Sequence, residues 1–142
     1  MIWRLSLADV AAAGPFSIFP GLTRVLTVIE GKGLRLRHAG GVIEAPPHMP
    51  VRFSGDAPIE CDLIDGPVRD FNLIYDPKRA EMNVALLGAG THIAKGVGLL
   101  PLSGACDVEN FGAVLTGAFL MFEEGGSRAI HVSDAALLVT KA

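Results

Sequence analysis

Apolar and polar residues alternate over short runs along most of this chain. In the first run Trp3, Leu5 and Leu7 share one face, whereas Arg4 and Ser6 share the other, as side chains of a β-strand do. Similar runs recur about every ten residues, separated by Gly, Pro, Asp or Asn, which is typical of antiparallel sandwiches and barrels. The pattern predicts an all-β fold with about ten or eleven mostly antiparallel strands in a closed or jelly-roll barrel.

Turn residues between the runs predict which strands pair. Segments 23–29 and 34–37 flank a turn at 30–33 that contains two glycines. Because glycine permits the positive φ angles of a tight turn, these segments are predicted to form a hairpin. A second hairpin is predicted between 59–63 and 68–75, where the chain also alternates on both sides of a turn.

The last third of the chain has a weaker pattern. Residues 110–122 could form a helix, but Gly112 and Gly117 would each destabilise it by about 1 kcal/mol. A strand is therefore the preferred interpretation. The segment 123–126, Glu-Glu-Gly-Gly, predicts a turn, and residues 135–140 are predicted to form the final strand.

Composition and charge indicate one globular domain in the cytoplasm. The chain has 142 residues, half of them apolar and 19% charged, so a single domain over residues 1–142 is predicted. A net charge of −3 provides no field that would attract nucleic acid. No apolar run reaches the roughly 18 residues of a membrane span. The isolated Cys61 and Cys106 predict reduced, buried thiols and a cytoplasmic location.

Polar residues in segment 68–75 are the main candidates for chemistry. The turn Asp65-Gly66-Pro67 leads into a strand that places Asp70 and Asn72 on one face. Two interpretations remain open. The two side chains either hydrogen-bond backbone groups at a strand bend, or they line an apolar pocket and orient a ligand there.

Arg24 is the third candidate, and it lies mid-strand among apolar residues. A solvated arginine is the default interpretation, and a guanidinium that binds a carboxylate is the alternative. If Arg24 shares the face of Asn72, the two side chains could hold an acidic metabolite with several donors. Arg69 is expected to pair with Asp65 or Asp70 instead of a ligand.

Several separated motifs occur in a distinctive order along the first half of the chain. They are Trp3-Arg4-Leu5-Ser6-Leu7-Ala8, Gly14-Pro15-Phe16-Ser17, Phe19-Pro20-Gly21 with Arg24, Glu30-Gly31, and Asp65-Gly66-Pro67-Val68-Arg69-Asp70-Phe71-Asn72. Together they resemble the HutD/Ves family of bacterial cupin-like proteins over about residues 2–76. From Lys78 onward the similarity consists of the strand pattern alone.

The resemblance implies an RmlC-like cupin barrel and a family associated with regulating histidine utilisation. Such proteins are thought to bind a small metabolite, with no established enzymatic activity, and no cofactor is expected. The resemblance also favours a ligand-binding role for Asp70 and Asn72, which Arg24 is predicted to join. Family members normally begin with a further segment that contains a Trp-x-Asn-Gly-Gly-Gly motif, and this chain is expected to lack it. Because unpaired strand edges seek partners, a homodimer is expected.

The histidines provide the alternative function. Metal-dependent cupins carry a His-x-His pair with a later His and Glu, whereas the four histidines here are far apart in sequence, which disfavours a metal site. The alternative is a cupin enzyme of the isomerase or oxygenase type with a non-standard metal site drawn from His48, His92 or His131. A structural dimeric module is a further possibility. No catalytic residue is assigned from the sequence.

Overall fold

The computed structural model describes residues 2–122 and 126–142 of the chain. These residues form strands, turns and loops without any helix. The chain divides into two compact units, unit 1 at Met1–Glu81 and unit 2 at Met82–Ala142. The single domain predicted over residues 1–142 stays a prediction.

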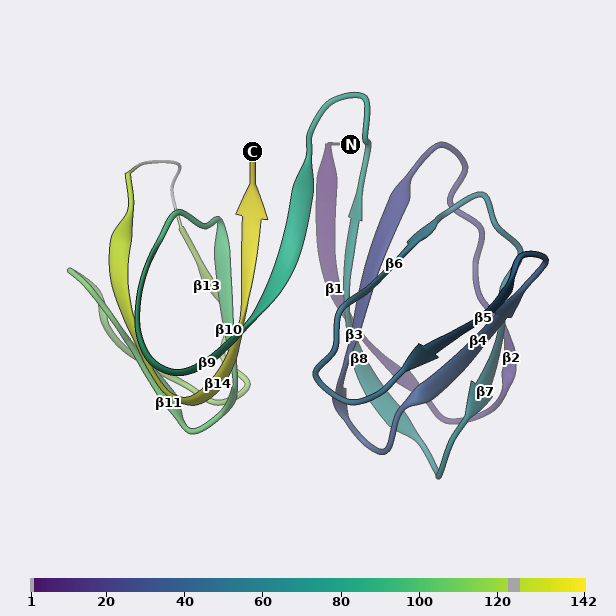
Figure 1. Cartoon of the computed structure of the whole chain (residues 1–142), viewed down its shortest axis with the longest axis horizontal. Helices are drawn as coiled ribbons and strands as arrows, with labels where there is room; N and C mark the ends of the chain where they lie inside the picture. The colour runs from purple at the N-terminus through teal and green to yellow at the C-terminus, as the bar shows by residue number, and fades with distance from the viewer. Residues whose placement is uncertain (1, 123–125) are drawn as a thin grey trace. The chain divides into compact units, whose positions relative to one another are not determined.

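Unit 1 is built from two antiparallel sheets, each with four strands among its described residues, in the orders β1-β8-β3-β6 and β2-β7-β4-β5 (Figure 1). The strands are β1 (Trp3–Val10), β2 (Gly14–Pro15), β3 (Thr23–Glu30), β4 (Leu34–His38), β5 (Gly41–Ala45), β6 (Val51–Ser54), β7 (Glu60–Leu63) and β8 (Val68–Tyr75). Except for β4 and β5, paired neighbours in these sheets are distant in sequence, which is typical of jelly-roll connections.

The core of unit 1 lies between these two sheets. Leu26 and Val28 of β3 pack in one buried cluster with Leu34 and Leu36 of β4 and with Cys61 of β7. Since the alternate residues of each strand point to one face, strands of both sheets contribute their inward residues to this cluster. The polar residues that share the inward face of β3 and β8 are thereby held inside the unit.

Both predicted hairpins are wrong, although turns do occur at the predicted places. β3 pairs with β6 and β8, whereas β4 pairs with β5 and β7. In the same way β7 pairs with β2 and β4, whereas β8 pairs with β1 and β3. Each turn therefore carries the chain from one sheet to the other. Gly31 has a φ of 101°, and a Cβ there would lie 2.6 Å from the carbonyl oxygen of Pro67, so this crossing requires glycine.

Unit 2 contains one curved antiparallel sheet, with six strands in the described part of the unit. The order is β12-β11-β14-β10-β13, and β9 pairs with β14 along most of its length (Figure 1). The strands are β9 (Met82–Ala94), β10 (Gly98–Ser103), β11 (Ala105–Val108), β12 (Gly112–Leu115), β13 (Leu120–Met121) and β14 (Arg128–Lys141). Apolar residues from β10, β11, β12 and β14 form its buried cluster.

For the last third of the chain, the predicted strands are confirmed as strands, but their boundaries differ from the predicted ones. The segment 110–122 contains the strands β12 and β13 and no helix, and the final strand β14 includes the predicted 135–140. Part of the turn predicted at 123–126 lies outside the described residues. The described residues form more strands than predicted, because two-residue strands such as β2 and β13 show no alternation in sequence.

Candidate functional site

One hollow of unit 1 collects the three residues singled out from the sequence. We call it the Arg24 hollow, and its volume is about 260 Å³. It lies on the inward face of β1, β3 and β8, beneath the loop that connects β2 to β3. Its lining residues are Arg4, Ser6, Ala8, Val10, Pro15, Phe16, Ser17, Phe19, Arg24, Asp70, Asn72 and Ile74.

The strand register explains why these residues meet. Asn72 of β8 lies opposite Ser6 of β1, and Asp70 lies opposite Ala8. On the other side of β8, Arg24 lies opposite Ile74. With a side-chain period of two, these positions all face the same side of the sheet. A register shift in β3 beside Asp70, between Val28 and Glu30, is a β-bulge of the kind that re-aims side chains near sites.

Arg24 is a buried cation with spare hydrogen-bonding capacity. Its residue is only 7% exposed. One Nη atom donates to the carbonyl oxygen of Ser17 over 3.2 Å, and the other donates to Oδ1 of Asn72 over 3.4 Å. The Nε–H group, also buried, has no hydrogen-bond partner among the described residues. Burial lowers the pKa of Arg24, and the nearby Asp70 opposes this effect.

Three phenylalanine rings surround the guanidinium group of Arg24. Its Cζ lies 5.2 Å from the ring centroid of Phe16, 5.1 Å from that of Phe19 and 5.0 Å from that of Phe53. Cation–π attraction at such distances stabilises a desolvated guanidinium by about 0.5 to 2 kcal/mol per ring. The rings therefore hold the charge inside unit 1 without occupying its hydrogen-bond donors.

Asp70 and Asn72 form the acidic side of the hollow. Asp70 is 2% exposed and Asn72 is 5% exposed. Nδ2 of Asn72 donates to Oδ1 of Asp70 over 2.7 Å. Burial raises the pKa of Asp70 to about 6, against the opposing effects of the Asn72 hydrogen bond and the Arg24 charge. Asp70 therefore titrates close to neutral pH, where an ordinary aspartate is ionised.

Arg4 adds a second cation at the rim of the hollow. Its side chain is exposed, and its Cζ lies 5.4 Å from the ring centroid of Phe19. Phe19 thus contacts both Arg4 and Arg24. With Asp70 ionised the hollow carries one net positive charge, and with Asp70 protonated it carries two. Either state favours an anionic occupant.

The structure shows where the residues singled out from the sequence lie, and a ligand-binding role for them stays a prediction. Arg24, Asp70 and Asn72 are brought together, and the solvated interpretation of Arg24 is wrong because packing against three rings buries it. The hydrogen bonds of Asp70 and Asn72 described above join side chains to each other, not to a strand bend. The pairing expected for Arg69 is also wrong, since its Nε donates to Asp9 over 3.0 Å.

The histidines do not converge on a metal site. No group of three or more His, Cys, Asp or Glu residues in the described ranges has the geometry to hold a metal ion. Nδ1 of His131 lies 3.1 Å from Oγ1 of Thr91, and Nε2 of His92 lies 2.8 Å from the carbonyl oxygen of Gly88. Cys61 and Cys106 are free and buried, as predicted.

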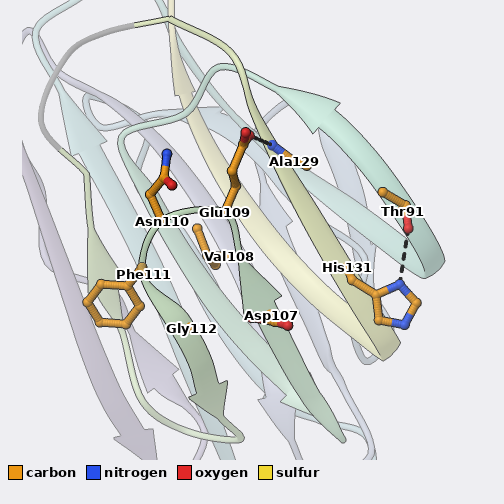
Figure 2. A pocket seen from close by; sticks show the side chains of 9 residues that line it. All are labelled: Thr91, Asp107, Val108, Glu109, Asn110, Phe111, Gly112, Ala129 and His131. Carbon is orange, nitrogen blue, oxygen red and sulfur yellow. Dashed lines mark hydrogen bonds between the residues drawn. The ribbon is translucent and has the colours of Figure 1, made fainter.

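A larger hollow in unit 2 is a weaker candidate. This His131 hollow has a volume of about 580 Å³. Figure 2 shows His131 at one end, next to Thr91, and Phe111 at the other. The charged side chains that line it are exposed, and Glu109 already accepts a hydrogen bond from the backbone of Ala129 over 2.8 Å. Exposed, locally paired groups orient a ligand less well than buried groups with unused donors.

Comparison with known proteins places this geometry in context. The family model described as HutD matches residues 2–136. An uncharacterised 21.2 kDa protein in the hutC 3′ region of Pseudomonas putida is 42% identical over 83 residues, or 54% of this chain and 41% of that protein. Protein Ves of Cronobacter sakazakii is 36% identical over 107 residues, or 72% of this chain and 59% of that protein. The chain spans about half the length of these curated relatives.

Among solved structures, HutD from Pseudomonas fluorescens SBW25, in a formate condition, is similar to this chain with a TM-score of 0.84. The sequence identity is 29%, and the match covers 99% of this chain and 79% of that one. The predicted fold class, an all-β cupin-type jelly-roll barrel, is confirmed by this match and by the strand content. The described residues contain no helix long and apolar enough to cross a bilayer.

Proposed function

This chain belongs to the HutD family of cupin-like proteins, and from that premise we propose that it binds a small carboxylic acid in the Arg24 hollow. Binding is the whole activity of the site, and no bond of the ligand is broken. The volume of about 260 Å³ lies just below the range of roughly 300 to 1,000 Å³ typical of pockets for drug-sized ligands. The occupant is therefore a small metabolite.

The buried Nε–H group of Arg24 is the observation that carries this proposal. A buried donor without a partner destabilises a folded protein by about 1 to 3 kcal/mol, and by more when it belongs to a charged group. A carboxylate accepts hydrogen bonds from a guanidinium group more strongly than a neutral acceptor does. A bound carboxylate would supply the missing acceptor and would be attracted by the positive charge of Arg4 and Arg24.

One relative supports a link to histidine utilisation. The Pseudomonas putida protein lies in the hutC 3′ region. We therefore extend the proposal to a metabolite-responsive regulator linked to histidine utilisation, in which occupancy of the Arg24 hollow reports the concentration of an acid.

No observation favours the alternative of a metal-dependent isomerase or oxygenase. The residues found to line the Arg24 hollow include no histidine or cysteine. Its hydroxyl groups, on Ser6 and Ser17, therefore have no imidazole beside them that could act as a general base. The ionisable groups that do line the hollow, Arg4, Arg24 and Asp70, support the binding of an acid.

Thermal unfolding in the presence of small acids tests the proposal. The panel contains histidine, urocanate, glutamate and formate, with glycerol as a neutral comparison. A ligand at about 100 times its Kd stabilises the folded state by about 2.7 kcal/mol, which raises Tm by several degrees. We expect at least one acid to do so with the wild-type chain.

Matched arginine variants locate the effect. Arg24→Gln removes the buried charge, whereas Arg35→Gln removes an exposed arginine whose Nε donates to Glu44 on the outside of unit 1. The Tm shift should disappear in the first variant and persist in the second. If Arg24→Gln does not fold, Asn72→Ala replaces it. Equal stabilisation of Arg24→Gln and wild type, or no stabilisation by any acid, would contradict the proposal.

Two further expectations accompany this function. A homodimer is expected, so light scattering should give a mass of about twice the 14.9 kDa of one chain. A monomeric particle at micromolar concentration would contradict it. A cytoplasmic location remains a prediction from the sequence.

A further inference from the structure

We infer that a carboxylate enters the Arg24 hollow together with one proton, which Asp70 takes up from water and then shares with the bound anion as a hydrogen bond. This inference rests on the proposed function and adds a specific role for Asp70. Asp70 is then the residue whose protonation responds to the charge of the ligand, so the affinity for the ligand depends on pH.

The position of Asp70 is the first argument. Its carboxyl group is almost wholly buried, lines the hollow, and accepts from Asn72 on Oδ1 only. The other oxygen, Oδ2, takes no hydrogen bond that the structure records in the described residues. An anion drawn in by Arg24 would share this small hollow with that carboxyl group. The nearest oxygen of Asp70 would then be an acceptor that faces another acceptor.

The charges around Asp70 provide the second argument. Arg24 on β3 attracts the ionised carboxylate, whereas Asp9 on β1 repels it, and Cys61 on β7 is near enough that Asp70 raises the pKa of its thiol. Arg4 on β1 acts on Arg24. No salt bridge joins Arg24 directly to Asp70 in the described part of unit 1, because the carboxamide of Asn72 lies between them.

Two carboxylates in one low-dielectric site do not both stay ionised. In such pairs one pKa rises strongly, and the pair shares a proton. Burial already raises the pKa of Asp70 to about 6, so protonation on binding is a small step at neutral pH. The balance is simple: one proton moves from water to Asp70, one O–H···O⁻ hydrogen bond forms, and no covalent bond of the ligand breaks.

The protonation state of Asp70 decides which ligands the hollow matches. A protonated Asp70 donates to a carboxylate oxygen, and Arg24 donates to it as well. A primary amide of the same shape matches the ionised form instead, because its N–H group donates to Asp70 while its oxygen accepts from Arg24. Binding of an acid is therefore linked to proton uptake, whereas binding of the amide is not.

The test measures how affinity depends on pH. The probes are sodium acetate and sodium formate, and chemical-shift titrations of the full chain provide Kd values between pH 5.5 and 8.5. For wild type, uptake of one proton makes Kd rise by up to tenfold per pH unit between the pKa of free Asp70, about 6, and its higher pKa in the complex. Asp70→Asn keeps an N–H donor at the same position, so its Kd should be nearly constant and tighter than that of wild type at pH 8.5.

Asp107→Asn in unit 2 is the matched control, since it removes an exposed aspartate far along the chain from the hollow residues. It should show the slope of wild type. If Asp70→Asn does not fold, carbon NMR of the Asp70 carboxyl group in wild type replaces it, and saturating acetate should raise that pKa by at least one unit. Binding with a Kd independent of pH would overturn the inference and leave the proposed function standing. Absence of binding at every pH would overturn both.

Discussion

Arg24 and Asp70 are the two buried charged residues of the Arg24 hollow, yet they are joined through a neutral group. Arg24 donates to the carboxamide oxygen of Asn72, and the carboxamide nitrogen of Asn72 donates to Asp70. A direct ion pair would neutralise both charges and leave little for a ligand to bind. The bridging amide keeps the cation and the acid apart, each with capacity for a further hydrogen bond.

Replacing the bridge should destabilise the chain strongly. Asn72→Ala leaves the Asp70 carboxyl group and one Nη of Arg24 without their partner inside unit 1. An unsatisfied buried polar group destabilises a protein by about 1 to 3 kcal/mol, so we expect a loss of about 2 to 4 kcal/mol in urea unfolding. Ser6→Ala, opposite Asn72 on β1, should change stability by less than about 1 kcal/mol. Similar losses in the two variants would contradict the bridging role.

The raised pKa of Asp70 predicts how stability depends on pH. The folded pKa, about 6, lies above the unfolded value of 3.8. The folded state therefore binds the proton more tightly, and this contribution is present below about pH 4 and is lost as pH rises through 6. Relative to wild type, Asp70→Asn should gain about 2 to 3 kcal/mol in going from pH 4 to pH 7.

Urea unfolding of wild type and Asp70→Asn at pH 4 and pH 7 measures this difference, and comparison of the two chains cancels the titration of the other carboxylates. Asp107→Asn is again the control, and its difference from wild type should not change between the two pH values. A relative loss of stability for Asp70→Asn at pH 7 would show that the ionised form is the favoured one.

Gly55 fixes the loop that covers the hollow. The N–H group of Gly55 donates to the carbonyl oxygen of Leu22 over 2.7 Å, and the carbonyl oxygen of Gly55 accepts from the N–H group of Phe19 over 2.9 Å. A Cβ at Gly55 would collide with the carbonyl oxygen of Phe19 and would lie 2.9 Å from that of Leu22. Gly55→Ala must therefore push the loop away from Arg24.

We expect Gly55→Ala to lose about 1 to 3 kcal/mol, as overpacked sites do, and to lose the Tm shift caused by the binding acid. Gly14→Ala is the control, because a Cβ there meets no atom within 4 Å and the φ angle of Gly14 is not positive. That variant should keep both its stability and its response to the acid. If Gly55→Ala keeps its response as well, the loop does not shape the hollow.

The sequence was sufficient to predict the strands that build the hollow, because alternation is a local property. The polar face of segment 68–75 could be predicted from its period of two, and Asp70 and Asn72 do share that face. Pairing is not local. The turn at Asp65-Gly66-Pro67 looks the same whether the chain folds back on itself or crosses to another sheet, so both hairpins were predicted wrongly.

Burial of Arg24 could not be predicted for a related reason. An arginine in an alternating strand is most often solvated, and its burial here depends on Phe16 and Phe19 from a loop and on Phe53 from β6. Arg4 was missed in the same way, since it joins the hollow only because β1 pairs with β8. These long-range contacts cannot be read from composition or spacing, whereas the family resemblance favoured a ligand-binding role for Asp70 and Asn72.

The shared position of Phe19 between Arg4 and Arg24 makes a last prediction. Phe19→Leu retains an apolar side chain but removes both cation–π contacts, worth about 0.5 to 1 kcal/mol each where they are partly exposed. Urea unfolding should therefore show a loss of about 1 to 2 kcal/mol, and the acid that stabilises wild type should bind several-fold more weakly because Arg24 is less firmly held. Phe111→Leu, at a ring that is 61% exposed in unit 2, should change stability by less than about 0.5 kcal/mol and leave binding unaltered. Equal effects at the two positions would mean that Phe19 serves the hollow only as apolar surface.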